Sequence, residues 1–194
     1  MTKIIGLTGG IGSGKTTIAK HIQSLGIPVY IADDEAKKIL ELPEIANEIN
    51  EVFGDVVFEY GKLSREKLAE IVFNNPQQLE KLNQIVHPAV RLHFDDWFKK
   101  QTQFDIVVKE AAILFESGSY KDCDVIISIS APLETRIQRV LKRDKSDIEN
   151  VMNRVKNQWT DEMRAEKSDY VIENLNVKIA ISQIDAILEE IAKK

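Results

Sequence analysis

Short apolar runs alternate along the chain with longer segments in which apolar residues recur at helical spacing. The first run is Lys3–Thr8, and runs of the same kind follow at 28–32, 104–109, 125–129 and 170–172. Buried strands of a parallel sheet are short and continuously apolar, whereas amphipathic helices place apolar residues three and four positions apart. We therefore expect an α/β protein with a mostly parallel sheet of about five strands.

The segments between these runs predict helices. One helix is expected over 17–25, where Gly26 and Pro28 end it, and a charged helical stretch is expected from 133 to about 159. Residues 36–103 are helical in pattern almost throughout, with one helix ending before Pro88 and another following it. This segment is too long for a simple crossover, so we interpret it as an inserted lobe.

Composition narrows the class of protein. The chain has 194 residues, a hydrophobic content of 43% and a net charge of −5, which argues against a general nucleic-acid or membrane-surface binder. Its one cysteine, Cys123, excludes an intramolecular disulfide framework. No apolar run approaches the length of a signal or membrane-spanning segment. We expect a cytoplasmic protein, with a monomer favoured, although the residues do not set the oligomeric state.

The first strand is followed at once by Gly9–Thr16, which reads Gly-Gly-Ile-Gly-Ser-Gly-Lys-Thr. In the pattern G-x-x-x-x-G-K-[ST], the main chain curls so that successive amide N–H groups point at a phosphate. Lys15 is then placed to reach the β- and γ-phosphates of a nucleoside triphosphate, and the Thr16 hydroxyl to ligate Mg²⁺. A glycine-rich turn without a ligand is the alternative. The expected binding residues are Gly10, Ile11, Gly12, Ser13, Gly14, Lys15, Thr16 and Thr17.

Two carboxylates, Asp33 and Asp34, follow the second apolar run and stand directly before a helical segment. Aspartate often caps a helix, which is one interpretation of Asp34 but does not account for both residues. The carboxyl ends of parallel strands gather at one edge of a sheet, so Asp33 is expected beside the phosphate site. A carboxylate there can orient an acceptor hydroxyl or take its proton during phosphoryl transfer.

The segment 133–144 combines an apolar helical stripe with a basic one formed by Arg136, Arg139 and Arg143. A solvated basic face is one explanation. The other is that an arginine neutralises the transferring phosphoryl group, which can raise the rate by about 10³–10⁵-fold. Arg139 and Arg143 are the candidates for that role, followed by Arg154. The polar stretch 145–154 is expected to cover the bound nucleotide and exclude water.

Taken together, these residues resemble the dephospho-coenzyme A kinases, a family in the P-loop nucleoside and nucleotide kinase group. The most specific likeness is the opening Gly6–Thr16, and shorter pieces agree in order over nearly the whole chain. These pieces are Ala32-Asp33, Gly61-Lys62-Leu63-Ser64-Arg65, Leu82-Asn83, His87-Pro88, Leu114-Phe115-Glu116, Arg139, Arg143-Asp144, Arg154, Gln158, Ser168-Asp169-Tyr170-Val171-Ile172 and Asn174.

The resemblance implies the three-layer P-loop NTPase fold and transfer of the γ-phosphoryl group of ATP, with Mg²⁺, to the ribose 3′-hydroxyl of dephospho-coenzyme A. This is the last step of coenzyme A synthesis, and it involves no nucleic acid or membrane. A nucleotide-binding core is implied over 1–33, 104–138 and 156–194. A helical coenzyme A-binding lobe is implied over 34–103, and a helical lid over 139–155.

The resemblance also implies roles for single residues. Asp33 matches the acidic residue at the family's acceptor site, and Asn174 is an adenine-side candidate. Arg65 and His87 are candidates for substrate contact, although a helix start explains Arg65 equally well and the following proline explains His87 equally well. Glu110 is a candidate in the substrate site, where its carboxylate could hold Mg²⁺ through water.

Two motifs depart from the family pattern. Ile31 stands where the family usually has the first aspartate of Asp-Ala-Asp, so no role of that carboxylate carries over. Glu110 and Ala112 stand where the family commonly has the aspartate and the proline of Asp-x-Pro-Leu-Leu. The missing proline is expected to alter the backbone there.

Two other functions stay open at this level. A kinase for another nucleotide or nucleoside would share the phosphate loop and the lid. A nucleotide-dependent switch would share the loop, but the sequence has no Asn-Lys-x-Asp segment to read guanine, and it has both a lobe and a lid.

Overall fold

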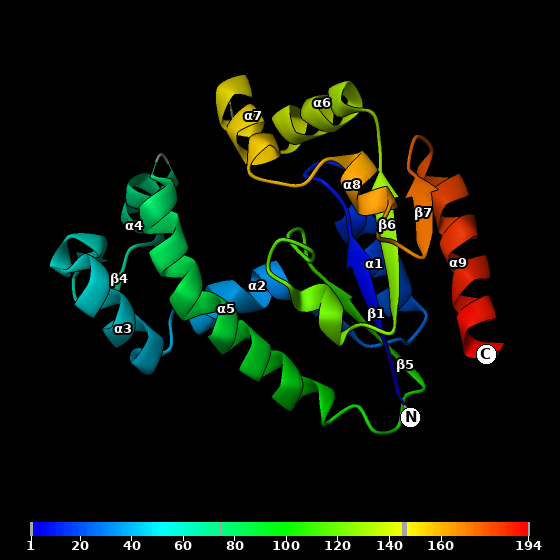
Figure 1. Cartoon of the computed structure of the whole chain (residues 1–194), viewed down its shortest axis with the longest axis horizontal. Coiled ribbons are helices and arrows are strands. Elements are labelled where there is room, and N and C mark those ends of the chain that lie inside the picture. The colour runs from blue at the N-terminus through cyan, green and yellow to red at the C-terminus, as the bar shows by residue number, and fades with distance from the viewer. Residues whose placement is uncertain (1, 74, 145–146, 194) are drawn as a thin grey trace. The chain divides into compact units, whose positions relative to one another are not determined.

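The computed structural model describes residues 2–73, 75–144 and 147–193, and its elements are labelled in Figure 1. The chain divides into two units. The first consists of Met1–Ile31 and Lys100–Lys194, and the second of Ala32–Lys99. The second unit is therefore a continuous insertion in the sequence of the first.

The first unit is built on a five-stranded sheet with the order β2-β5-β1-β6-β7. Its strands are β1 (Lys3–Thr8), β2 (Val29–Ile31), β5 (Ile106–Glu110), β6 (Val125–Ser130) and β7 (Tyr170–Glu173). Every pairing in this sheet is parallel. The predicted α/β class is confirmed, because each of the five apolar runs forms one strand of a parallel sheet.

The strand register brings the chemically important strand ends together. Leu7 on β1 is paired with Glu110 on β5, and Thr8 is paired with Ser128 on β6. β1 is the central strand, so the loop that follows it has the ends of β5 and β6 on either side. Residues after these three strands therefore meet at one edge of the sheet.

Five α-helices belong to the described part of the first unit: α1 (Lys15–Ser24), α6 (Leu133–Asp144), α7 (Ile148–Lys156), α8 (Asp161–Ala165) and α9 (Val177–Lys193). A short 3₁₀ turn spans Ser119–Asp122. The apolar face of α1, with Ile18 and Ile22, shares one core with Ile184 and Leu188 of α9 and with the strands. Figure 1 shows α9 alongside β7. This packing holds the start of α1 directly after the central strand.

The helical stretch predicted from 133 to 159 is divided in the structure. α6 ends at Asp144, and α7 begins at Ile148 after an N-cap in which the Asp147 carboxylate accepts from the Asn150 amide at 2.8 Å. The proposed lid, 139–155, includes residues 145 and 146, which lie outside the described residues. The sequence analysis did not predict α8, because five residues are too few to show a helical period.

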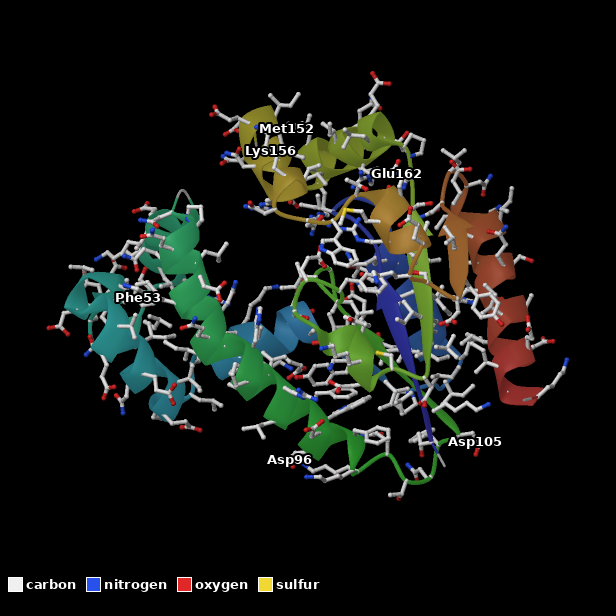
Figure 2. The ribbon with its side chains drawn as sticks, viewed as in Figure 1. Phe53, Asp96, Asp105, Met152, Lys156 and Glu162 are labelled. Carbon is white, nitrogen blue, oxygen red and sulfur yellow. The ribbon has the colours of Figure 1, made fainter. Side chains whose placement is uncertain are left out.

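The second unit is mainly helical, with α2 (Ala32–Ile39), α3 (Pro43–Phe53), α4 (Arg65–Phe73) and α5 (Pro76–Phe98). A 3₁₀ turn at Asp55–Val57 leads into the antiparallel pair β3 (Phe58–Glu59) and β4 (Lys62–Leu63). This unit has a separate core that includes Ile39, Ile49 and Leu68. Phe53, labelled in Figure 2, packs against that core from the end of α3.

Two local expectations in this unit were wrong. The β3–β4 hairpin was not predicted. Its turn residues Tyr60 and Gly61 both have positive φ, 49° and 74°, as in the tightest hairpins. The helix expected to end before Pro88 instead continues through it as α5. An interior proline costs a helix about 3 kcal/mol, and packing of α5 against α2, α3 and α4 offsets that loss.

Within the described ranges, no helix combines the length and the apolar character needed to cross a bilayer.

Candidate active site

The phosphate loop joins β1 to α1. Gly12 and Gly14 have φ values of 79° and 98°, in the left-handed region that favours glycine, and Gly14 is the N-cap of α1. Neighbouring atoms also leave no room for a side chain at these two positions. A Cβ on Gly12 would overlap the main-chain oxygen of Arg136, and one on Gly14 would overlap Nδ2 of Asn174. The loop conformation is therefore fixed both by its own backbone and by Arg136 on α6 and Asn174, which follows β7.

Lys15 lies in the first turn of α1, and Thr16 and Thr17 follow it as exposed residues. Lys15 is buried, although it directly follows the glycine-rich loop. The residue is only 8% exposed. Its Nζ lies 3.7 Å from Oε1 of Glu110, whose residue is 2% exposed. The structure thus pairs the loop's ammonium group with the acid at the end of β5.

Two observations fit this loop to a phosphate and its metal ion. The buried hydroxyl oxygens of Thr8 and Ser13 have no hydrogen-bond partner within the described part of the chain. No group of three metal-ligating side chains occurs among the described residues. The second observation is the type of oxygen that α1 and β5 offer, because Mg²⁺ keeps several waters and takes one or two protein oxygens together with substrate phosphates. The exposed Thr16 hydroxyl and the Glu110 carboxylate are residues of that type.

Arg139 and Asn174 hold the phosphate loop through hydrogen bonds to its main-chain oxygens. Arg139 donates through Nη2 to the Asn174 main-chain oxygen at 2.8 Å, and through Nη1 to the main-chain oxygens of Gly12 and Ser13 at 3.5 and 3.4 Å. Asn174 follows β7, is 2% exposed, and donates through Nδ2 to the Ser13 oxygen at 2.8 Å. Two predicted site residues from distant segments therefore meet at the same carbonyl oxygen.

Arg143 and Arg154 contact a carboxylate on their own segment. Asp144 accepts from Nε of Arg143 at 2.6 Å and from its Nη2 at 2.9 Å, and Nη1 of Arg154 lies 3.6 Å from the same carboxylate. The hydrogen bond from Arg143 lowers the pKa of Asp144, and the same bond raises the pKa of Arg143. Both arginines are substantially exposed, as are Lys156 and Glu162 on α7 and α8 (Figure 2).

Three predicted site residues belong to the second unit. Asp33 is exposed in the first turn of α2, and its neighbour Asp34 accepts from Lys37 Nζ at 2.7 Å. Because α2 begins at Ala32, Asp34 is not the N-cap that one interpretation made it. Arg65 is the exposed first residue of α4. His87 is half-buried in α5, where burial lowers the pKa of its imidazole and the Glu80 carboxylate opposes that shift.

The sequence analysis missed a buried ionic cluster beside the loop, formed by Glu116, Arg136, Asp161 and Arg164. Arg164 is fully buried. Burial lowers the pKa of its guanidinium, and Glu116 and Asp161 oppose that shift. In the sequence, Arg136 is recognisable only as part of a basic helical stripe, and Glu116 only as part of the Leu114-Phe115-Glu116 piece. No sequence pattern indicated a role for Arg164, because the helix that carries it was not predicted.

The sequence is similar to those of known proteins over most of its length. Residues 3–179 match the family model described as Dephospho-CoA kinase. The Dephospho-CoA kinase of Bacteroides fragilis is 40% identical over 181 residues, covering 93% of this chain and 88% of the relative. That of Fusobacterium nucleatum is 39% identical over 190 residues, covering 97% of this chain and 98% of the relative.

Solved structures agree with this likeness. The dephospho-CoA kinase from Campylobacter jejuni is 29% identical, with a TM-score of 0.73 and coverage of 100% of this chain and 98% of that one. A Thermus thermophilus protein of known structure is 33% identical, with a TM-score of 0.87 and coverage of 97% of each chain. Shikimate kinase from Acinetobacter baumannii, 18% identical with a TM-score of 0.57 and coverage of 100% and 94%, shares the fold.

Proposed function

The chain belongs to the dephospho-CoA kinase family, and from that membership we propose that it transfers the γ-phosphoryl group of ATP to the ribose 3′-hydroxyl of dephospho-coenzyme A. The products are coenzyme A and ADP, as in the last step of coenzyme A biosynthesis. The observation that carries this proposal is the family match over residues 3–179, which includes the phosphate loop with its buried Lys15–Glu110 pair.

The triphosphate binds the loop from Gly10 to Thr17. Main-chain amides and the N-terminus of α1 attract its negative charge, and Lys15 supplies a full positive charge. Lys15 is already held near the edge of the sheet by Glu110 at 3.7 Å, so its side chain is ordered before ATP arrives. Charge placed in advance in a site of low dielectric stabilises phosphoryl transfer more than a mobile charge does.

When bound, magnesium would supply positive charge that neutralises the phosphate oxygens. In this chain the Thr16 hydroxyl is the proposed direct ligand, and the Glu110 carboxylate the proposed partner of a bound water. The support is that both residues are tied to the edge of the sheet: Thr16 in the first turn of α1, and Glu110 as the last residue of β5.

Asp33 orients the 3′-hydroxyl or accepts its proton, and the second unit holds the rest of dephospho-coenzyme A. Asp33 comes two residues after β2, in an exposed position that is open to a substrate. Arg65 is the proposed partner of an acceptor phosphate, because a guanidinium binds phosphate through paired hydrogen bonds. His87 is the proposed neutral hydrogen-bonding contact, since burial lowers its pKa.

Arg139 and Arg143 neutralise the phosphate charge, and residues 139–155 close over the nucleotide. Arg143 is exposed and pairs with its neighbour Asp144, and it can exchange that carboxylate for a phosphate. Asn174, beside Arg139, is the proposed contact on the adenine side. Closure that excludes water suppresses ATP hydrolysis in favour of transfer. A cytoplasmic monomer is the proposed setting.

The test is a product analysis with purified protein, Mg²⁺ and ATP. Dephospho-coenzyme A, shikimate and nucleoside monophosphates are offered separately, and the products are separated by chromatography and identified by ³¹P NMR. We expect a new 3′-phosphomonoester with dephospho-coenzyme A only. Consumption of a monophosphate alone, or release of inorganic phosphate without acceptor phosphorylation, would refute the assignment.

A further inference from the structure

Two arginines from different helices flank the start of the phosphate loop. A Cβ on Gly10 would overlap Nη1 of Arg136 on α6 and would lie 3.5 Å from Nη1 of Arg164 on α8. Both arginines are buried, at 7% and 0% exposed. The Arg136 guanidinium therefore occupies the space that any side chain at position 10 would need.

One carboxylate holds both guanidinium groups. Asp161 accepts from Nη1 of Arg164 at 3.0 Å, and its other oxygen lies 3.5 Å from Nη2 of Arg136. Arg136 also donates through Nε to the Ala131 oxygen at 3.0 Å. Nη2 of Arg164 lies 3.7 Å from Oε1 of Glu116. The two arginines are thus matched by two acids, as buried charges require.

A second connection reaches the next residue of the loop. The Ile11 amide donates to Oε1 of Gln158 at 2.9 Å. Gln158 is followed by Trp159, whose amide donates to Oε1 of Glu116 at 2.7 Å. The acid that faces Arg164 therefore also fixes the segment that carries Gln158. At Gly12, a Cβ would lie 2.9 Å from the Cα of Arg136, so α6 contacts this part of the loop as well.

We propose that Arg136, Asp161, Arg164 and Gln158 form a positioning network that sets the main chain of Gly10–Gly12 in its phosphate-binding form. Arg136 acts through the backbone of the loop, because its guanidinium lies against Gly10 and its main chain lies against Gly12. Arg164 holds Asp161 in place through the hydrogen bond of 3.0 Å. The inference rests on the proposed function for the identity of the ligand, a nucleotide phosphate. It adds that α6 and α8 determine the shape of the site that the phosphates meet.

The network makes a specific demand on Arg136. One planar guanidinium contacts the Ala131 oxygen, the Asp161 carboxylate and the face of Gly10 at once. A lysine keeps the charge but presents a single point, so it cannot reproduce that geometry. Arg136→Lys therefore removes the positioning while leaving the buried charge in place.

The experiment measures ATP and ADP binding to Arg136→Lys by calorimetry in the presence of Mg²⁺, with thermal unfolding recorded in parallel. The matched control is Lys167→Ala, which removes an exposed charge just after α8. A displacement of about 1 Å in an active site can lower the reaction rate about 10²-fold. For a displaced phosphate loop we expect both nucleotides to bind at least about 10-fold more weakly. The control should bind normally, and the KM for dephospho-coenzyme A should change little in either variant.

Three results would overturn the proposal. Weaker ATP binding with unchanged ADP binding would mean that Arg136 contacts the γ-phosphate itself. A lower melting temperature with normal nucleotide affinity would mean a purely structural role. Unaltered amide resonances of Gly10 and Gly12 in ¹⁵N-glycine spectra of Arg136→Lys would mean that the loop does not depend on the guanidinium.

A double-mutant cycle with Asp161→Asn provides an independent measurement. If Asp161 acts through Arg136, the loss of nucleotide affinity in the double variant should be smaller than the sum of the two single losses. Additive losses would contradict the network. The nucleotide-binding, thermal-unfolding and NMR measurements do not need the acceptor. If ATP binds as described but dephospho-coenzyme A is not phosphorylated, the proposed function fails and the network stands.

Discussion

Nζ of Lys15 lies 3.7 Å from Oε1 of Glu110, and the two side chains are only 9% and 3% exposed. The lysine that follows the glycine-rich loop is therefore buried, and it faces the carboxylate at the end of the neighbouring strand, β5. Phosphate oxygens that bind the loop would compete with Glu110 for this ammonium group. The pair is therefore a structural contact in the free protein and a source of positive charge for the nucleotide.

Lys15→Ala should lower kcat/KM for ATP by about 10²-fold or more, because it removes a charge aimed at the transferring group. It should also destabilise the fold by roughly 1–3 kcal/mol, since it deprives the buried Glu110 of a partner. Steady-state kinetics and urea unfolding measure the two effects. The double variant Lys15→Ala, Glu110→Gln is the control, and it should recover stability without recovering activity. Recovery of both would contradict the assigned role.

Asp33→Asn should lower kcat by roughly 10²-fold while leaving ATP affinity unchanged, because loss of a general base affects the transfer step. Asp34→Asn is the matched control. It changes the adjacent, equally exposed carboxylate, whose partner is Lys37 at 2.7 Å. Rates with dephospho-coenzyme A and calorimetry with ATP give the two quantities. Lost ATP binding with normal turnover in Asp33→Asn would instead place this residue in nucleotide recognition.

Gly12→Ala should abolish measurable ATP binding, whereas Gly26→Ala should not. Both glycines have similar positive φ, 79° and 84°, so each substitution carries about 1–2 kcal/mol of backbone strain. Only at Gly12 would the new Cβ meet the backbone of Arg136. At Gly26 no atom of the described residues, apart from its own helix and chain neighbours, lies within 4 Å of the added Cβ. Calorimetry and thermal unfolding of the pair separate strain from crowding, and equal loss of ATP binding in both would show that crowding is unimportant.

Arg143→Ala and Arg139→Ala should differ in their effect on stability. Arg139 donates to three main-chain oxygens around the loop, so its loss should lower both the melting temperature and the rate. Arg143 is exposed and pairs with Asp144, so its loss should lower kcat while the melting temperature stays nearly unchanged. Thermal unfolding and initial rates test this contrast. Full activity in Arg143→Ala would remove it from the catalytic candidates.

His87 should make the fold sensitive to mild acid. Burial holds the pKa of the folded imidazole below 6.5, so the unfolded chain binds the proton more readily. The stability that depends on neutral His87 is therefore present above pH 6.5 and is lost as the pH falls toward the folded pKa. Urea unfolding from about pH 8 to about pH 5 should show a smaller acid-induced loss in His87→Gln than in the parent. If the free energy of unfolding fell equally with pH in the parent and in His87→Gln, His87 would not contribute to the acid sensitivity.

The sequence by itself determined the features that depend on local pattern. Each of the five apolar runs became a strand, because a buried parallel strand needs a short, continuous apolar segment. The phosphate loop was equally readable, since its glycines and Lys15 have fixed spacing. Local pattern was less informative where an element is very short, as at α8 and the Tyr60–Gly61 hairpin. It was also less informative at Pro88, where packing of α5 against its neighbouring helices outweighs the free-energy cost of a proline inside a helix.

Only the tertiary structure decided which charges are buried and what they contact. Spacing grouped Arg136, Arg139 and Arg143 on one face of a helix, yet Arg136 is buried against Gly10, Arg139 supports Ser13, and Arg143 is exposed beside Asp144. Likewise, the spacing of the loop residues does not show that Lys15 is buried, and only the structure places it beside Glu110 of β5. Burial depends on neighbours that are far away in the chain, since 95 residues separate Lys15 from Glu110 and 126 separate Arg136 from Gly10. No period or motif within one segment contains that information.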